Sequence, residues 1–168
     1  MVPGQHHLGP QAMSTRATRR PWAGMLPLVA MSLLSCAGLP PTNLGVSASG
    51  LAPCPPSPNC VSSDATDTAH AIPPFQLGVP PPEAWQTARD VVAALPRTRI
   101  VHETSDYLHA ECKSTLIGFV DDLELHLRAP AGIIAVRSAS RVGYSDLGVN
   151  RRRVEGVRAA LAERGVLR

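Results

Sequence analysis

The chain has 168 residues, which suits one domain with its own core, and an aromatic content of 4% predicts that this core is aliphatic. The formal net charge of +3 comes from Arg16, Arg19 and Arg20, because residues 36–168 hold equal numbers of basic and acidic side chains. Nucleic-acid binding needs a net basic surface, so the composition argues against nucleic acid as a partner.

Residues 13–36 predict an export signal that ends in a lipidation site. After the three arginines, an apolar run covers residues 25–34. This run is too short to span a hydrocarbon layer of about 30 Å, but it suits the hydrophobic region of a secretory signal. The following letters, LLSC, resemble a bacterial lipobox, so Cys36 is expected to carry lipid. An ordinary signal peptide cut nearby, with Cys36 unmodified, is the alternative.

The chain is therefore divided into three parts. Residues 1–35 are interpreted as a signal peptide whose true start is Met13. Residues 36–53 are rich in Pro, Gly and Ser without periodicity, which predicts a lipidated flexible tether. Residues 54–168 are expected to form a single α+β domain. Ala37, next to the lipidated cysteine, resembles the outer-membrane sorting pattern and favours the bacterial cell envelope, with the body in the periplasm and the membrane as a partner through the lipid anchor.

Two of the remaining cysteines predict a disulfide. Cys54 and Cys60 enclose a short proline-rich loop, CPPSPNC, in a chain that is expected to reach an oxidising compartment. Cys112 falls in a strand pattern and is expected to be a buried free thiol. A nucleophilic Cys60 with His70 as its base is the competing hypothesis, and it is disfavoured because a bridged cysteine has no free thiol.

The body begins with a helix over residues 82–95, in which an apolar stripe recurs at helical spacing and Pro96 follows. Two strands come next, TRIVHET and YLHAECKS, which form a hairpin around Ser105 and Asp106. The segments GFVDDLELHLRA and IIAVRSAS form a second hairpin with its turn near Pro130. This hairpin places Glu124 opposite Arg137, on a sheet face that is expected to be open to solvent.

The last segment, NRRRVEGVRAALAERG, predicts a second helix with Asn150 as its N-cap. The element order is therefore α-β-β-β-β-α. We expect an α+β, two-layer fold in which both helices cover one face of a mostly antiparallel four-stranded sheet.

Three stretches of this sequence resemble a known family. They are SPNCVSS (57–63), GFVDDLE (118–124) and RSASRVGYSDLGVNRRRVE (137–155). Together they are similar to the bacterial and plant family of domains of unknown function numbered fourteen-ninety-nine, over roughly residues 54–161. The resemblance implies an envelope or membrane-associated domain and supplies no catalytic residues.

Polar residues in and beside the second hairpin form the candidate site. They are Asp121, Asp122, Glu124, Arg137, Ser138, Ser140, Arg141, Asp146 and Asn150. Adjacent residues of a strand point to opposite faces, so Asp121 and Asp122 do not form a two-carboxylate centre without a bulge. We favour a brace of ion pairs in which Arg137 and Arg141 each meet an acid. The alternative is an anion site formed by these two arginines, with the Asn150 cap and the first N–H groups of the last helix.

Histidines on the strands give a further alternative. His102 and His109 are expected to face each other across the first hairpin, and with His126 they offer three imidazole nitrogens to a metal ion. Ordinary solvated histidines are the favoured interpretation, so no metal and no cofactor are predicted.

These observations favour a non-enzymatic module of the cell envelope. Its expected partner, besides the membrane, is an unknown envelope protein or a small anionic or lipid-like ligand. The alternative function is a small-anion-binding or hydrolytic enzyme that uses the acidic and arginine-rich region.

Overall fold

The computed structural model describes Met1 and residues 38–115 and 118–168, which form an α+β fold. The predicted signal peptide, its start at Met13 and the lipidation site at Cys36 lie outside the described residues. The elements in chain order are β1 (Val46–Ser47), β2 (Gly50–Leu51), β3 (Cys60–Ser62), β4 (Phe75–Gln76), α2 (Pro81–Ala93), β5 (Thr98–Glu103), β6 (Tyr107–Lys113), β7 (Val120–Arg128), the 3₁₀ turn η1 (Ala129–Ala131), β8 (Ile133–Ser140) and α3 (Val149–Glu163).

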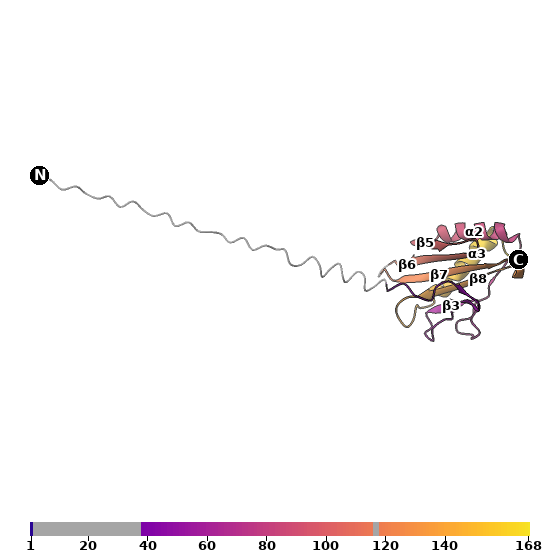
Figure 1. Cartoon of the computed structure of the whole chain (residues 1–168), viewed down its shortest axis with the longest axis horizontal. Helices are drawn as coiled ribbons and strands as arrows, with labels where there is room; N and C mark the ends of the chain where they lie inside the picture. Colours follow the sequence, from indigo (N-terminus) through magenta and orange to yellow (C-terminus); the bar gives the residue numbers. More distant parts are fainter. Residues whose placement is uncertain (2–37, 116–117) are drawn as a thin grey trace.

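The main sheet is antiparallel and has six strands in the described part of the chain. Five of them lie side by side in the order β3-β8-β7-β6-β5 (Figure 1), and β4 also pairs with β8. The predicted α+β class and antiparallel sheet are confirmed, but the four-stranded layout is wrong. The strands that it lacks, β3 and β4, are only three and two residues long, too short to produce an alternating pattern.

The hairpins have the predicted register. Glu124 pairs with Arg137 across β7 and β8, and Leu125 pairs with Val136. His102 likewise pairs with His109 across β5 and β6. The alternation of β7 therefore decides which side chains reach each face of the sheet.

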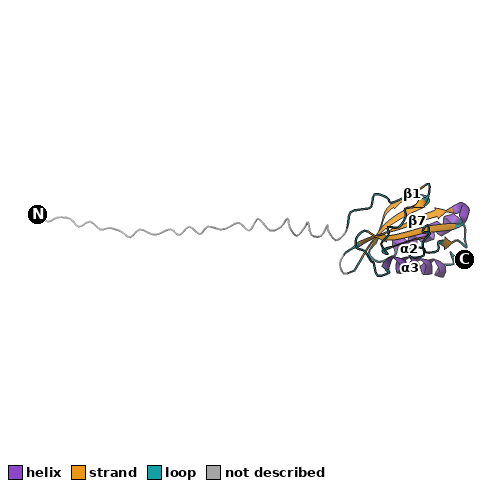
Figure 2. Cartoon of the chain, turned by 90° about the horizontal axis from the view of Figure 1, so that it is seen from below, coloured by secondary structure: helices purple, strands orange, loops and turns teal. Residues whose placement is uncertain are grey.

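Both helices cover one face of the sheet, as Figure 2 shows for α2 and α3. Helix α2 buries Trp85, Ala88 and Val92, and its prolines lie in the first turn, where an absent N–H costs no helical hydrogen bond. Helix α3 buries Val154 and Leu161. These side chains pack against the alternate aliphatic residues of the strands, so one aliphatic core lies between the two layers.

The opposite sheet face is covered by residues that were predicted to form a flexible tether. β1 and β2 form a small hairpin on this side (Figure 2). Leu51, which is 3% exposed, packs with Tyr107 and Ala135, and the Gly45 N–H donates to Glu124. This differs from the flexible linker and from the open sheet face that the sequence predicts. Backbone N–H groups of the segment pair with carboxylates far away in the sequence, which composition does not reveal.

None of the helices within residues 38–115 and 118–168 has the length and apolar character that a bilayer crossing requires.

Candidate functional site

A network of charged side chains lies on the sheet face away from the helices. It is formed by residues of β6, β7 and β8 and the loop after β8, which are His109, Glu111, Asp122, Glu124, Arg137 and Arg141. Strand alternation places them on one face, and residues 38–53 exclude solvent from its centre. We call this set the charged network.

Glu124 lies at the centre of the charged network and is fully buried. Its Oε2 accepts a hydrogen bond from Nη1 of Arg137 at 2.9 Å, and its Oε1 accepts from the Tyr107 hydroxyl at 2.8 Å. The Gly45 N–H donates to the same Oε1 at 2.9 Å. Burial, and then the nearby Glu124 carboxylate, raise the pKa of Tyr107 well above its ordinary range, so the phenol stays a donor. The buried charge is therefore neutralised and hydrogen-bonded within the fold.

Asp122 forms the second half of the charged network. Arg141 donates to both carboxylate oxygens, from Nε at 2.9 Å and from Nη2 at 2.7 Å. His109 Nε2 lies 2.7 Å from Oδ1 of Asp122, and Nη2 of Arg141 also donates to Glu111 at 2.7 Å. The Arg141 side chain is only 4% exposed, so the acids that surround it occupy the guanidinium.

Acid is expected to weaken the fold through Asp122 and Glu111. Burial opposes ionisation of both, but hydrogen bonds from His109 and Arg141 to Asp122, and from Arg141 and Arg99 to Glu111, lower the two pKa values below 3.8 and 4.5. A folded-state pKa below the unfolded value gives stability that is present above the unfolded pKa and lost as the pH falls through the folded one. Urea unfolding at pH 7, 4 and 3 should show falling stability below about pH 4.5. Constant stability down to pH 3 contradicts this expectation.

Asp121 points to the other face of the sheet. Its Oδ2 accepts a hydrogen bond from Nη2 of Arg153 in α3 at 2.6 Å. The two neighbouring aspartates therefore pair with different arginines on opposite faces, and they do not form a joint acidic centre. This arrangement follows from the unbroken alternation of β7 at this point.

Asn150 lies between α3 and the sheet and is fully buried. Its Oδ1 accepts from the Ser138 hydroxyl at 2.6 Å, and its Nδ2 donates to the Asn59 carbonyl at 3.0 Å and to Ser140 Oγ at 2.9 Å. One amide therefore joins α3, β8 and the residue before β3. The two serines lie on the helix side of β8, away from Arg137 and Arg141.

The predicted N-cap role of Asn150 is wrong. Helix α3 begins at Val149, and Asp146 receives the free backbone groups of its first turn. Oδ1 of Asp146 accepts from the Gly148 N–H at 2.9 Å, and Oδ2 accepts from the Asn150 N–H at 2.7 Å. Asp146 therefore does not neutralise Arg137 or Arg141, and the helix start that an anion site would need is already occupied.

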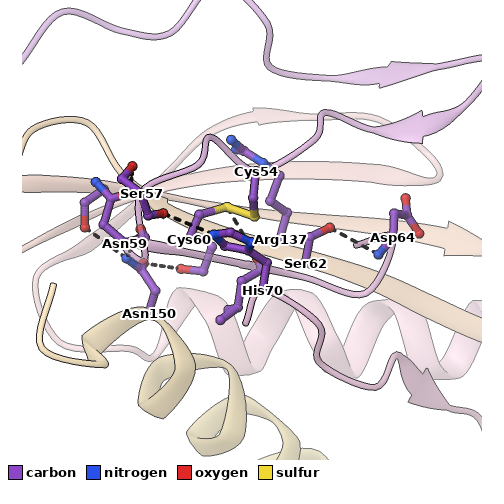
Figure 3. Close-up of a disulfide and its surroundings, with 12 residues drawn as sticks. Cys54, Ser57, Asn59, Cys60, Ser62, Asp64, His70, Arg137 and Asn150 are labelled. Atoms are coloured by element: carbon purple, nitrogen blue, oxygen red, sulfur yellow. Dashed lines mark hydrogen bonds between the residues drawn. A yellow bond between two sulfur atoms is a disulfide. The ribbon is translucent and has the colours of Figure 1, made fainter. Parts of the chain in front are cut away.

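The SPNC motif forms a connected structure around the disulfide (Figure 3). The Cys54–Cys60 bond is present, as predicted, and Cys112 is a buried free thiol. Asn59 Nδ2 donates to the Gly143 carbonyl at 2.7 Å, which joins the motif to the loop after β8. His70 pairs with Asp67 at 2.7 Å, and its Nε2 lies 3.2 Å from the Ser57 carbonyl oxygen. Because the Cys60 sulfur is bonded, His70 has no thiol to activate there.

Loss of the disulfide is expected to weaken the fold by about 2 kcal/mol, because the bond closes a short loop and restricts the unfolded chain. Urea unfolding of a Cys54→Ala/Cys60→Ala chain measures this. Reductant should lower the stability of the unaltered chain to that of the double variant and leave the variant unchanged. Thiol labelling of Cys54 without reductant contradicts the prediction.

A surface pocket of about 430 Å³ adjoins the charged network. It lies between the segment before β2 and the strands β5 and β6, and its lining includes Leu44, Val46, His102, Tyr107 and His109. The proposed partner of these histidines, His126, instead pairs with Tyr107 in the strand register. No cluster of three or more His, Cys, Asp or Glu suited to a metal ion occurs within the described residues.

Sequence reasoning missed three contributors to this region. Asn59 is part of a motif that was recognised, but its contact with Gly143 spans 84 residues. Tyr107 and Gly45 donate to Glu124 from segments that have no alternating charge pattern. The one available signal is Glu124: if its burial is assumed, Arg137 alone does not satisfy both carboxylate oxygens, so further donors are needed.

The described part of the chain is a small α+β domain. Its polar motifs connect the sheet with helix α3 and with residues 38–53, which lie over the outer sheet face. A protein-family model described as "Protein of unknown function (DUF1499)" matches residues 50–161. The chain belongs to this family, and the resemblance that its motifs indicate is confirmed. No curated protein and no solved structure matches the chain.

Proposed function

We propose that the chain is a lipoprotein of the bacterial cell envelope, anchored through Cys36, whose folded body is a non-enzymatic binding module. The observation that supports a non-enzymatic body is that the side chains of the charged network pair with one another. Asp122, Glu124, Arg137 and Arg141 contact one another and their neighbours, and none of these four lines the pocket beside β5. Such groups stabilise a structure and leave little to bind or transform a substrate.

The alternative, an anion-binding or hydrolytic enzyme that uses the same residues, has less support. Both arginines are already paired with carboxylates. Arg137 Nε is a buried side-chain nitrogen that lacks a partner among the described residues, but no described pocket reaches it. A catalytic role needs groups that can reach a reacting molecule.

The surface that suits a ligand is the pocket beside β5. Leu44 and Val46 supply apolar walls, and His102 supplies an imidazole, since Nε2 of His109 is already held by Asp122. A small molecule with an apolar part and an acidic group matches this lining, because imidazole nitrogens can donate hydrogen bonds to an anion. We therefore propose a small anionic or lipid-like ligand at this place.

The anchor is tested by changing Cys36 to serine. The unaltered chain should stay in the membrane fraction and gain the mass of its acyl chains, and Cys36→Ser should lose both properties. Cys112→Ser is the matched control, since it removes a buried free thiol outside the export signal. Equal membrane retention and mass gain in the two variants would refute the anchor.

The pocket is tested by a thermal-shift screen against phosphates, fatty acids and envelope phospholipids. A ligand at 100 times its dissociation constant stabilises a fold by about 2.7 kcal/mol, which is measurable. His102→Ala should abolish the shift, whereas Arg99→Ala, on the same strand but outside the pocket lining, should retain it. A shift that both variants retain contradicts binding at this pocket.

A further inference from the structure

Exposed apolar side chains gather at one end of the body. Besides Met1, seven large hydrophobic residues of the described chain are exposed, and five belong to the segment after Gly38, the loops that precede β7 and α3, or the first residue of α3. These five are Leu39, Phe119, Tyr144, Leu147 and Val149, and we call them the loop end. The exposure is 76% for Tyr144 and 84% for Leu147. A gathering of this kind on a small domain marks an interaction surface.

We propose that the loop end lies directly on the lipid bilayer and inserts these side chains into its interface. The inference rests on the proposed lipid anchor at Cys36, and it adds which side of the body meets the membrane. Tyrosine suits the membrane interface because its ring is apolar and its hydroxyl can stay in contact with water. The aliphatic side chains on the neighbouring loops can enter the apolar part of the bilayer.

The position of Gly38 connects the anchor with the loop end. Gly38 packs against the first residues after β8, and a Cβ atom built on it would lie 2.8 Å from Cβ of Arg141 and 3.0 Å from Cγ1 of Val142. The described chain thus begins beside the loop between β8 and α3 (Figure 1). Covalent geometry limits the two residues from Cys36 to Gly38 to a span of about 7 Å. A lipid on Cys36 therefore holds this end, and not the opposite one, at the membrane surface.

The charges around the loop end favour anionic headgroups. Arg97, Lys113 and Arg152 are exposed at this end, where Arg97 and Lys113 share a pocket wall with Val149. The acids nearby, Asp121 and Asp146, are already bound to Arg153 and to the start of α3. Exposed cations near anionic lipid contribute attraction, so the apolar tips are surrounded by groups that suit the headgroup layer.

The loop that carries Tyr144 and Leu147 is held in place. Asn59 donates to the Gly143 carbonyl at 2.7 Å, and Arg152 donates to the Leu147 carbonyl at 2.8 Å. Leu147 has a φ of 52°, a conformation that L-residues with a side chain rarely adopt. Such strain persists where surrounding contacts impose it and is common at functional loops. The fold therefore fixes an exposed leucine outward, which core formation does not explain.

The orientation is tested with single labels on the full acylated chain in vesicles of phosphatidylethanolamine and phosphatidylglycerol. A cysteine introduced by Tyr144→Cys or Leu147→Cys carries an environment-sensitive dye. Cys54 and Cys60 are bridged and Cys112 is buried, so the new thiol is labelled selectively. Ala131→Cys is the matched control, because it is exposed on the turn between β7 and β8, at the opposite ends of these strands.

We expect brominated lipid to quench the labels at 144 and 147, and aqueous iodide to quench the label at 131. If Cys36 is acylated and all three labels respond to iodide alone, the membrane contact is overturned while the anchor stands. If Cys36 is unmodified, the anchor falls, and the same labels on a Cys36→Ser chain added to vesicles still decide the contact. Labels at 144 and 147 that are sheltered from both quenchers indicate a second copy of the chain at this surface and also overturn the proposal.

Discussion

Replacing Glu124 with alanine should lower the free energy of unfolding by about 3–5 kcal/mol, a large part of the stability of a domain of this size. The side chain is fully buried, and its loss leaves the Arg137 guanidinium in the fold without a countercharge. The Tyr107 hydroxyl and the Gly45 N–H lose their acceptor at the same time. Urea unfolding followed by circular dichroism measures the change.

A matched control and a double variant separate the charge from the packing. Glu155→Ala removes an exposed carboxylate that pairs with Arg158 at 2.9 Å, and exposed pairs of this kind contribute about 0–1 kcal/mol. Glu124→Met combined with Arg137→Met replaces the buried pair by apolar side chains and should recover the part of the loss that comes from the unpaired guanidinium. The Tyr107 hydroxyl and the Gly45 N–H still lack their acceptor in this variant. If Glu124→Ala is as stable as Glu155→Ala, the charged network does not contribute to the free energy of unfolding.

Asn150→Ala is expected to cost about 2–3 kcal/mol, because its loss leaves buried polar groups without partners. The Asn59 carbonyl and the Ser138 hydroxyl both lie in contact with the buried amide. Loosening of α3 against β8 should also appear as faster hydrogen exchange in that helix. Both quantities are measurable on the same purified variant.

Glu163→Ala is the control for Asn150, since it lies in the same helix and is exposed. It should change stability by no more than about 0.5 kcal/mol. Equal effects of the two substitutions would mean that the buried amide is not what joins the helix to the sheet. Asn150→Asp is a sharper test, because it removes the donor to Asn59 and buries a charge.

The sequence predicts the long strands well and the covered face poorly. β7 has nine residues, and its alternation of leucines and charged residues determines both faces and the pairing of Glu124 with Arg137. From the sequence alone, the charged residues of its outer face appear exposed to solvent. The alternation of residue types does not reveal that another segment of the chain covers this face. The cover is formed by residues 38–53, in which β1 and β2 are only two residues long each, and it meets the sheet through separate groups such as the Gly45 N–H and the Leu51 side chain.

The helix start shows another limit. Asparagine before a helical pattern is a good N-cap residue, so sequence position alone favours Asn150. In the structure Gly148 is the N-cap residue, and the Asp146 carboxylate accepts from backbone N–H groups at the helix start. Asn150 instead turns inward to polar groups from β8 and the SPNC motif. These partners lie 12 and 91 residues away in the sequence, so only tertiary structure can distinguish the two roles.

The placement of residues 38–53 against the sheet changes the reach of the whole protein. A free coil of this length has a root-mean-square extension of roughly 20 Å, which would let the body explore a deep layer above the membrane. With those residues folded, the proposed anchor has only about two residues of slack, so the pocket beside β5 keeps one height and one tilt. Because Tyr107 pairs with His126 near the end of β7, the pocket lies toward the end of the sheet opposite the loop end. The short link therefore holds the pocket away from the bilayer surface and favours ligands that reach it from the aqueous compartment.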